Sequence, residues 1–86
     1  MLQSLSIVTI TFNNPEDLLK TYKSLESFRK IGGEHIIVNG GTTIKQLIGD
    51  DCVLLEESDK GIYDALNKGI ELVRTPFFML IHSGDF

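Results

Sequence analysis

Four short segments rich in β-branched and large apolar residues alternate along the chain with segments of helical periodicity. They comprise residues 5–12, 35–38, 53–55 and 77–81. The connections between them are too long for β-hairpins, so we expect crossover connections between parallel strands. Strands that are apolar almost throughout are typical of a parallel sheet buried on both faces. This alternation predicts an α/β architecture.

The segments between the predicted strands read as helices. The first begins at Asn14, a favoured N-cap, with Pro15 at the first helical position, and ends at the glycine pair 32–33. Its predicted apolar stripe is Leu18, Tyr22, Leu25 and Phe28, and its predicted solvent face is Lys20, Lys23, Glu26 and Arg29. A weak helix is expected around residues 44–48. A helix over residues 61–73 would direct Ile62, Leu66, Ile70 and Val73 to the core.

These elements predict a Rossmann-like fold, a three-layer parallel sheet in the strand order 3-2-1-4 with helices on both faces. The 86 residues are expected to form a single domain, and 42% hydrophobic with 23% charged residues is a globular composition. A formal net charge of −4 argues against a nucleic-acid partner. The single Cys52 cannot form an internal disulfide, and no apolar run is long enough to span a membrane. We expect a cytoplasmic location, with peripheral attachment at the inner face of the membrane left open.

Polar residues follow each of the four predicted strands. They comprise Phe12–Asn14, Asn39–Thr42, Glu56–Gly61 and His82–Asp85. The carboxyl ends of parallel strands share one edge of the sheet, and ligands of such folds bind beyond that edge. The opposite edge needs only ordinary turns. We therefore expect a ligand site at the carboxyl edge.

Each candidate residue also has a structural interpretation. Asp85 is a hard oxygen ligand suited to Mg²⁺ or Mn²⁺, or equally a turn residue. Asn39 offers a donor and an acceptor to a base edge, or forms a turn. Phe12 offers a ring face, although a phenylalanine at a strand end is more often core. The helix dipole alone explains Asp64 more readily than a ligand does. His82 is a solvated loop residue more often than a ligand.

Several other enzyme classes lose support because their motifs are absent. The sequence contains no dinucleotide-binding glycine motif, no Walker lysine loop and no Cys-x-x-Cys pair. It also lacks a Ser/His/Asp arrangement. Dinucleotide-dependent dehydrogenases and P-loop NTPases are therefore disfavoured.

Four stretches together resemble the family 2 glycosyltransferases, which have a GT-A fold. The most specific is Asp59–Ile70, DKGIYDALNKGI, typical of bacterial members that build surface polysaccharides. The others are Ser6–Asn13, Ile36–Thr42 and Ser83–Phe86, in the order and at the spacing of the family. The resemblance covers practically the whole chain and implies that residues 1–86 are the N-terminal nucleotide-sugar-binding portion of such an enzyme, ending at the metal-binding loop.

The resemblance implies a nucleoside diphosphate sugar as donor, above all a UDP-sugar, with Mn²⁺ or Mg²⁺ held by Asp85. In the family this metal offsets the charge of the departing nucleoside diphosphate. The implied nucleotide-sugar-binding residues are Thr11, Phe12, Asn13, Asn39, Gly40, Asp64, Asn67 and Gly84. Three positions depart from the family's usual residues, with Asn39 in place of Asp, Phe12 in place of Tyr and Gly84 where an acidic residue is common. The implied reaction is an inverting hexosyl transfer to a polysaccharide or lipid-linked acceptor.

Members of the family are much longer than this chain, and their later part supplies the acceptor site and the carboxylate that acts as general base. We therefore expect little or no transferase activity from these residues alone, and no catalytic residue is identified. The last predicted strand would present an open edge, through which self-association is expected. The alternative function is a non-catalytic nucleotide-binding or assembly module that uses this edge. A flavodoxin-like domain is a third interpretation, which the stretch 59–70 disfavours.

Overall fold

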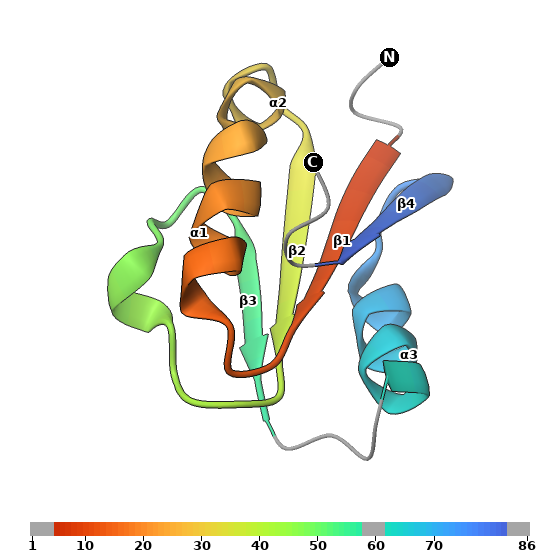
Figure 1. The fold of residues 1–86 in the computed structure, drawn as a ribbon. Helices are drawn as coiled ribbons and strands as arrows, with labels where there is room; N and C mark the ends of the chain where they lie inside the picture. Colours follow the sequence, from red (N-terminus) through yellow and green to blue (C-terminus); the bar gives the residue numbers. More distant parts are fainter. Residues whose placement is uncertain (1–4, 58–61, 83–86) are drawn as a thin grey trace.

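The sheet consists of four parallel strands in the order β3-β2-β1-β4, as the sequence predicts. The computed structural model describes residues 5–57 and 62–82. The strands are β1 (Leu5–Thr11), β2 (Glu34–Asn39), β3 (Val53–Glu56) and β4 (Phe77–His82). Their bounds differ from the predicted ones by at most one residue at either end. With helices on both sides of this sheet, the fold is a Rossmann-like α/β fold (Figure 1).

The two central strands are buried on both faces, whereas the two outer strands are not. Every residue of β1 after Leu5 and every residue of β2 after Glu34 is buried. The register places Val8 beside Ile36 on one side and beside Leu80 on the other. Neither β3 nor β4 contains a fully buried residue. The prediction of two-sided burial is therefore confirmed for the central strands and wrong for the outer ones.

Each face of the sheet has its own hydrophobic core. Helix α3 (Ile62–Leu72) covers one face, where the buried core residues are Val8, Ile10, Ile36, Val38 and Ala65. Helices α1 (Pro15–Ser24) and α2 (Glu26–Lys30) cover the other face together with the 3-10 helix η2 (Lys45–Leu47). The buried residues there are Leu18, Ile37 and Ile44. Figure 1 shows α1 and α3 on opposite sides of the strands.

The first predicted helix is two helices. The chain leaves helical geometry at Leu25, with φ −100° and ψ 10°, so α1 ends at Ser24 and α2 starts at Glu26. Asn14 does occupy the N-cap position, but its side chain donates to Asp17 Oδ2 at 2.9 Å and makes no capping hydrogen bond. The longest described helix, α3, has 11 residues, and no described helix is long and apolar enough to cross a membrane.

Helix α3 packs on the sheet through its smallest residues. Ala65 is 1% exposed, and a Cβ added to Gly69 would lie 2.6 Å from Val8 Cγ1. Ile70, predicted to face the core, is 37% exposed. The close approach at Gly69 turns the helix so that Ala65 and Gly69, rather than Ile70, meet the strands.

Candidate functional site

The loops that follow β1 and β2 lie against each other at the carboxyl edge of the sheet. The Gly40 N–H donates to the Thr11 carbonyl at 3.1 Å, and the Thr42 N–H donates to Asn13 Oδ1 at 2.8 Å. Asn13 has a positive φ of 50°, a conformation that asparagine adopts more readily than most residues. A Cβ on Gly41 would collide with Asn13, so the two loops can approach this closely only with glycine there. The structure thus brings together the polar clusters that follow β1 and β2, and Glu56 of the third cluster joins them through Asn39.

Asn39, a predicted ligand-binding residue, faces inward and is 1% exposed. Its amide nitrogen donates to the Thr42 carbonyl at 2.8 Å and to Glu56 Oε2 at 2.7 Å. Its oxygen accepts the Gly41 N–H at 3.0 Å. Because an asparagine amide has only two hydrogens to donate, both are used within the protein. In this arrangement Asn39 shapes the loop and presents no donor to a ligand.

Glu56, the last residue of β3, organises the same loop and was not singled out from the sequence. It accepts hydrogen bonds from Asn39, from the Thr43 hydroxyl at 2.7 Å and from the Ile44 N–H at 2.8 Å. Partial burial acts to raise the pKa of Glu56, but its hydrogen bonds from Ile44, Thr43 and Asn39 outweigh burial and hold that pKa below its ordinary value. A carboxylate at the end of a strand is a common surface residue, so only the tertiary contacts distinguish Glu56.

Phe12 lies immediately after β1 with its side chain open to solvent. The residue is 63% exposed, whereas the preceding Thr11 is 3% exposed. The interpretation of Phe12 as a core residue is therefore wrong. An exposed ring beside a polar loop is a surface on which a planar group can stack.

Two further predicted residues lie on α3. Asp64 is in the first turn, and its carboxylate pairs with Lys68 at 3.2 Å. Lys68 also pairs with Glu57 at 3.1 Å, which ties the start of α3 to the end of β3. Asn67 is exposed. Asp64 therefore lies near the carboxyl edge, with its charge shared with a lysine.

Of the remaining predicted residues, the structure describes His82 only. Gly84 and the predicted metal ligand Asp85 lie outside the described residues. His82 is the last residue of β4, half-buried and in register with Ile10 of β1. Within residues 5–57 and 62–82, no group of three or more His, Cys, Asp or Glu side chains could hold a metal ion. The described residues therefore do not supply a metal site by themselves, and Asp85 remains a prediction.

A hollow of about 340 Å³ opens between the two loops and the helices on that side of the sheet. Its lining residues are Asn13, Asn14, Pro15, Thr42, Thr43, Ile44, Gln46 and Leu47. The walls come from the loop after β1, the start of α1, and the segment from the β2 loop into η2. The hollow lies at the carboxyl edge of the sheet, and the exposed Phe12 directly precedes Asn13, which lines it.

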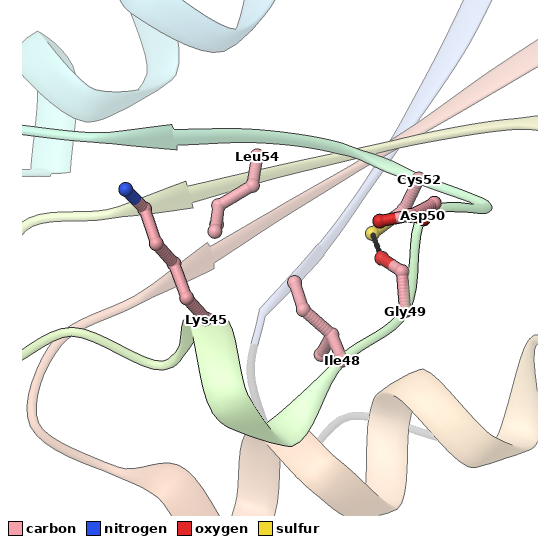
Figure 2. A pocket seen from close by; sticks show the side chains of 6 residues that line it. All are labelled: Lys45, Ile48, Gly49, Asp50, Cys52 and Leu54. Carbon is pink, nitrogen blue, oxygen red and sulfur yellow. Dashed lines mark hydrogen bonds between the residues drawn. The ribbon is translucent and has the colours of Figure 1, made fainter.

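A second hollow, of about 330 Å³, lies between η2 and β3 and is drawn in Figure 2. Cys52 donates weakly to the Gly49 carbonyl at 3.7 Å, and burial, the main cause, raises the pKa of this thiol. Lys45 points away from Cys52 at the far end of the hollow (Figure 2). The hollow therefore contains a neutral thiol, and we assign it no role.

A buried polar cluster lies toward the amino ends of the strands, around Arg29, which was predicted to face solvent but is 8% exposed. Its Nε donates to Asp51 at 2.9 Å, and its Nη1 donates to the Tyr22 carbonyl at 2.7 Å and to His35 Nδ1 at 3.2 Å. Because arginine can only donate, His35 Nδ1 must accept, and its Nε2–H donates to Thr9 Oγ1 at 2.8 Å. The cluster joins α1, α2, β1, β2 and the loop before β3, and its groups satisfy one another.

Two curated proteins are similar to the chain, both named uncharacterized glycosyltransferases, from strains CDC 1551 and H37Rv of Mycobacterium tuberculosis. Each is 34% identical to the chain over an alignment that covers 95% of the chain and 34% of the relative. The chain thus spans about a third of the length of these relatives. No family model matches the chain, and no solved structure matches it.

Proposed function

We propose that this chain is the donor-binding part of a glycosyltransferase that uses a nucleoside diphosphate sugar. The observation that carries this proposal is the similarity to two proteins named glycosyltransferases along 95% of the chain. The fold agrees with it, because parallel α/β sheets of this order bind ligands beyond the carboxyl ends of their strands. Residues 1–86 would then be one nucleotide-sugar-binding unit of a longer enzyme.

The carboxyl edge supports binding of the nucleoside end of the donor. The exposed ring of Phe12 can stack on a base, and the hollow next to Asn13 has room for a small group. In the β2 loop the N–H groups of Gly40, Gly41 and Thr42 all have protein acceptors. That loop therefore has no free backbone N–H among these three residues to donate to a phosphate, and we assign binding of the diphosphate to Gly84 and Asp85 instead.

The finer assignment follows the family resemblance. The longer enzyme would be an inverting hexosyltransferase of family 2 with a GT-A fold. Its donor would be a UDP-sugar, and it would act in the cytoplasm on a polysaccharide or lipid-linked acceptor. Thr11, Asn39 and Gly40 shape the rim beside the nucleoside, and Asp64 and Asn67 approach from α3. Asp85 would hold Mn²⁺ or Mg²⁺, which supplies charge neutralisation for the leaving nucleoside diphosphate when bound.

Calorimetric titration of the chain with UDP, in the presence and absence of Mn²⁺, tests this proposal. We expect binding that requires the metal and is lost in Asp85→Ala. The matched control is Asp50→Ala, which removes the same charge from an exposed residue in the loop before β3 and should leave binding unchanged. A folded chain that takes up no UDP with Mn²⁺ would contradict the proposal.

The second candidate is a non-catalytic assembly module. It is favoured by β4, whose residues Phe77, Phe78 and Met79 are 66%, 44% and 50% exposed. In the described sheet β4 pairs only with β1, so its other edge has no strand beside it. Such an edge is suited to pairing with another chain.

A further inference from the structure

We propose that Glu56 is a positioning residue for the nucleotide site, and that its ionised carboxylate holds the β2 loop in its ligand-binding shape. This inference rests on the proposed function for its ligand, and on the contacts of Glu56 for its mechanism. Asn39, which the sequence singles out, then acts through Glu56 rather than by touching the nucleotide.

The carboxylate binds the loop at three points. Oε2 accepts from the side chain of Asn39 and from the backbone of Ile44, and Oε1 accepts from the hydroxyl of Thr43. An ionised carboxylate has about four lone-pair sites and donates nothing, so it suits a position where three donors converge. Such charge-assisted hydrogen bonds are about twice as strong as those between neutral groups. Glu56 thereby fixes both the start and the end of the loop.

The effect of Glu56 reaches the loop after β1 through two contacts. With one amide hydrogen on Glu56, Asn39 directs the other to the carbonyl of Thr42. The N–H of Thr42 in turn donates to Asn13 Oδ1, next to the exposed Phe12. Asn13 and Thr42 both line the hollow of about 340 Å³. A change at Glu56 therefore alters the walls of the proposed nucleoside site without any direct contact to the ligand.

Electrostatics and positioning predict opposite effects when the Glu56 charge is removed. UDP is an anion, so a negative side chain nearby repels it, and Glu56→Gln would strengthen binding if charge alone mattered. If Glu56 positions the loop, the same substitution weakens binding, because a glutamine places an NH₂ group where donors already point. The direction of the change thus separates the two roles.

The experiment measures UDP affinity in the presence of Mn²⁺ for wild type, Glu56→Gln and Glu57→Gln. Glu57 is the neighbouring residue and carries the same charge. Its side chain is 53% exposed and pairs with Lys68 of α3, while its backbone N–H donates to the Asn39 carbonyl. We expect Glu57→Gln to bind UDP as well as wild type or better. We expect Glu56→Gln to bind at least about fivefold more weakly, the factor that corresponds to losing one hydrogen bond. Equal or tighter binding by Glu56→Gln would overturn the proposal.

A second variant and a ligand-free measurement keep the test decisive. Thr43→Val removes one of the three donors from an exposed position, and should weaken UDP binding less than Glu56→Gln does.

Amide hydrogen exchange by NMR should show faster exchange at the Ile44 N–H in Glu56→Gln than in wild type. Unchanged exchange would refute the role of Glu56 in holding the β2 loop. If wild type binds no UDP, the proposed function fails, and the role of Glu56 toward a nucleotide fails with it. The exchange data then still decide whether Glu56 holds the loop.

Discussion

His35 is a titratable side chain, and the folded protein disfavours its protonated form. Burial is the main cause and Arg29 the second, and together they lower the pKa of His35 to about 4 from an ordinary 6.5. The hydrogen bond from Arg29 to Nδ1 acts in the same direction, since a protonated imidazole would turn a donor toward a donor. His35 therefore stays neutral through the physiological range.

The first prediction is a loss of stability as the pH falls from about 6.5 to about 4. In this window the unfolded chain protonates His35 and the folded chain does not, so the unfolded state binds more protons and is favoured. The contribution of His35 between pH 7 and pH 5 should be about 2 kcal/mol. Urea unfolding at the two pH values measures it.

The control for this prediction is His35→Gln, which removes the titrating group. Carboxylates also contribute to acid sensitivity, so the difference between wild type and variant is the relevant quantity. The free energy of unfolding of His35→Gln should change less between pH 7 and pH 5 than that of wild type. The same pH dependence in both proteins would show that His35 is not protected from protonation.

At the residue scale, sequence patterns did not predict which side chains the folded protein pairs with one another. Periodicity placed Arg29 on the solvent face, because a local pattern does not include Asp51, 22 residues later, which draws the guanidinium inward. In the same way, Asn39 was a candidate by itself, whereas its partner Glu56, 17 residues on, was named only as part of the polar cluster 56–61. The exposure of Phe12 shows that the core interpretation is wrong, while its stacking on a base stays a prediction.

At the element scale, α3 depends on one glycine. Gly69 lies over Val8, which is fully buried and has a stiff branched side chain, so a methyl group at position 69 has no space. We predict that Gly69→Ala destabilises the fold by about 1–2 kcal/mol, because overpacking outweighs the gain in helix propensity. Glu71→Ala, at an exposed position of the same helix, should change stability by less than about 0.5 kcal/mol. Thermal or urea unfolding measures both, and a stabilised Gly69→Ala would contradict the close packing.

Element types and bounds were largely predictable, since strands this apolar and a helix that starts at Asn14-Pro15 carry strong local signals. The break at Leu25 and the turn of α3 onto Ala65 and Gly69 were not. Both result from packing against the sheet, which a one-dimensional periodicity does not contain. The strand order was predictable because right-handed crossovers leave few topologies open.

At the scale of the whole molecule, the described sheet has unequal edges. β3 has four residues, a length that limits pairing with other chains. β4 has six residues, none of them Asp, Glu, Lys or Arg, and three of its large apolar residues are exposed. β4 also contains no proline, a residue that often protects an edge strand from pairing.

The final prediction is that the chain self-associates through β4. Sedimentation over a range of concentrations should show a monomer in exchange with a larger species, and Phe77→Lys should shift the equilibrium toward the monomer, because a charge on an edge strand opposes pairing. Phe12→Lys is the matched control, since Phe12 and Phe77 are 63% and 66% exposed but only Phe77 lies on the edge strand. If both variants dissociate the larger species equally, general hydrophobicity rather than the β4 edge drives association. A wild-type chain that stays monomeric at the highest concentration would show that β4 does not drive self-association. The exposed edge of β4 would then no longer favour an assembly module over a donor-binding unit.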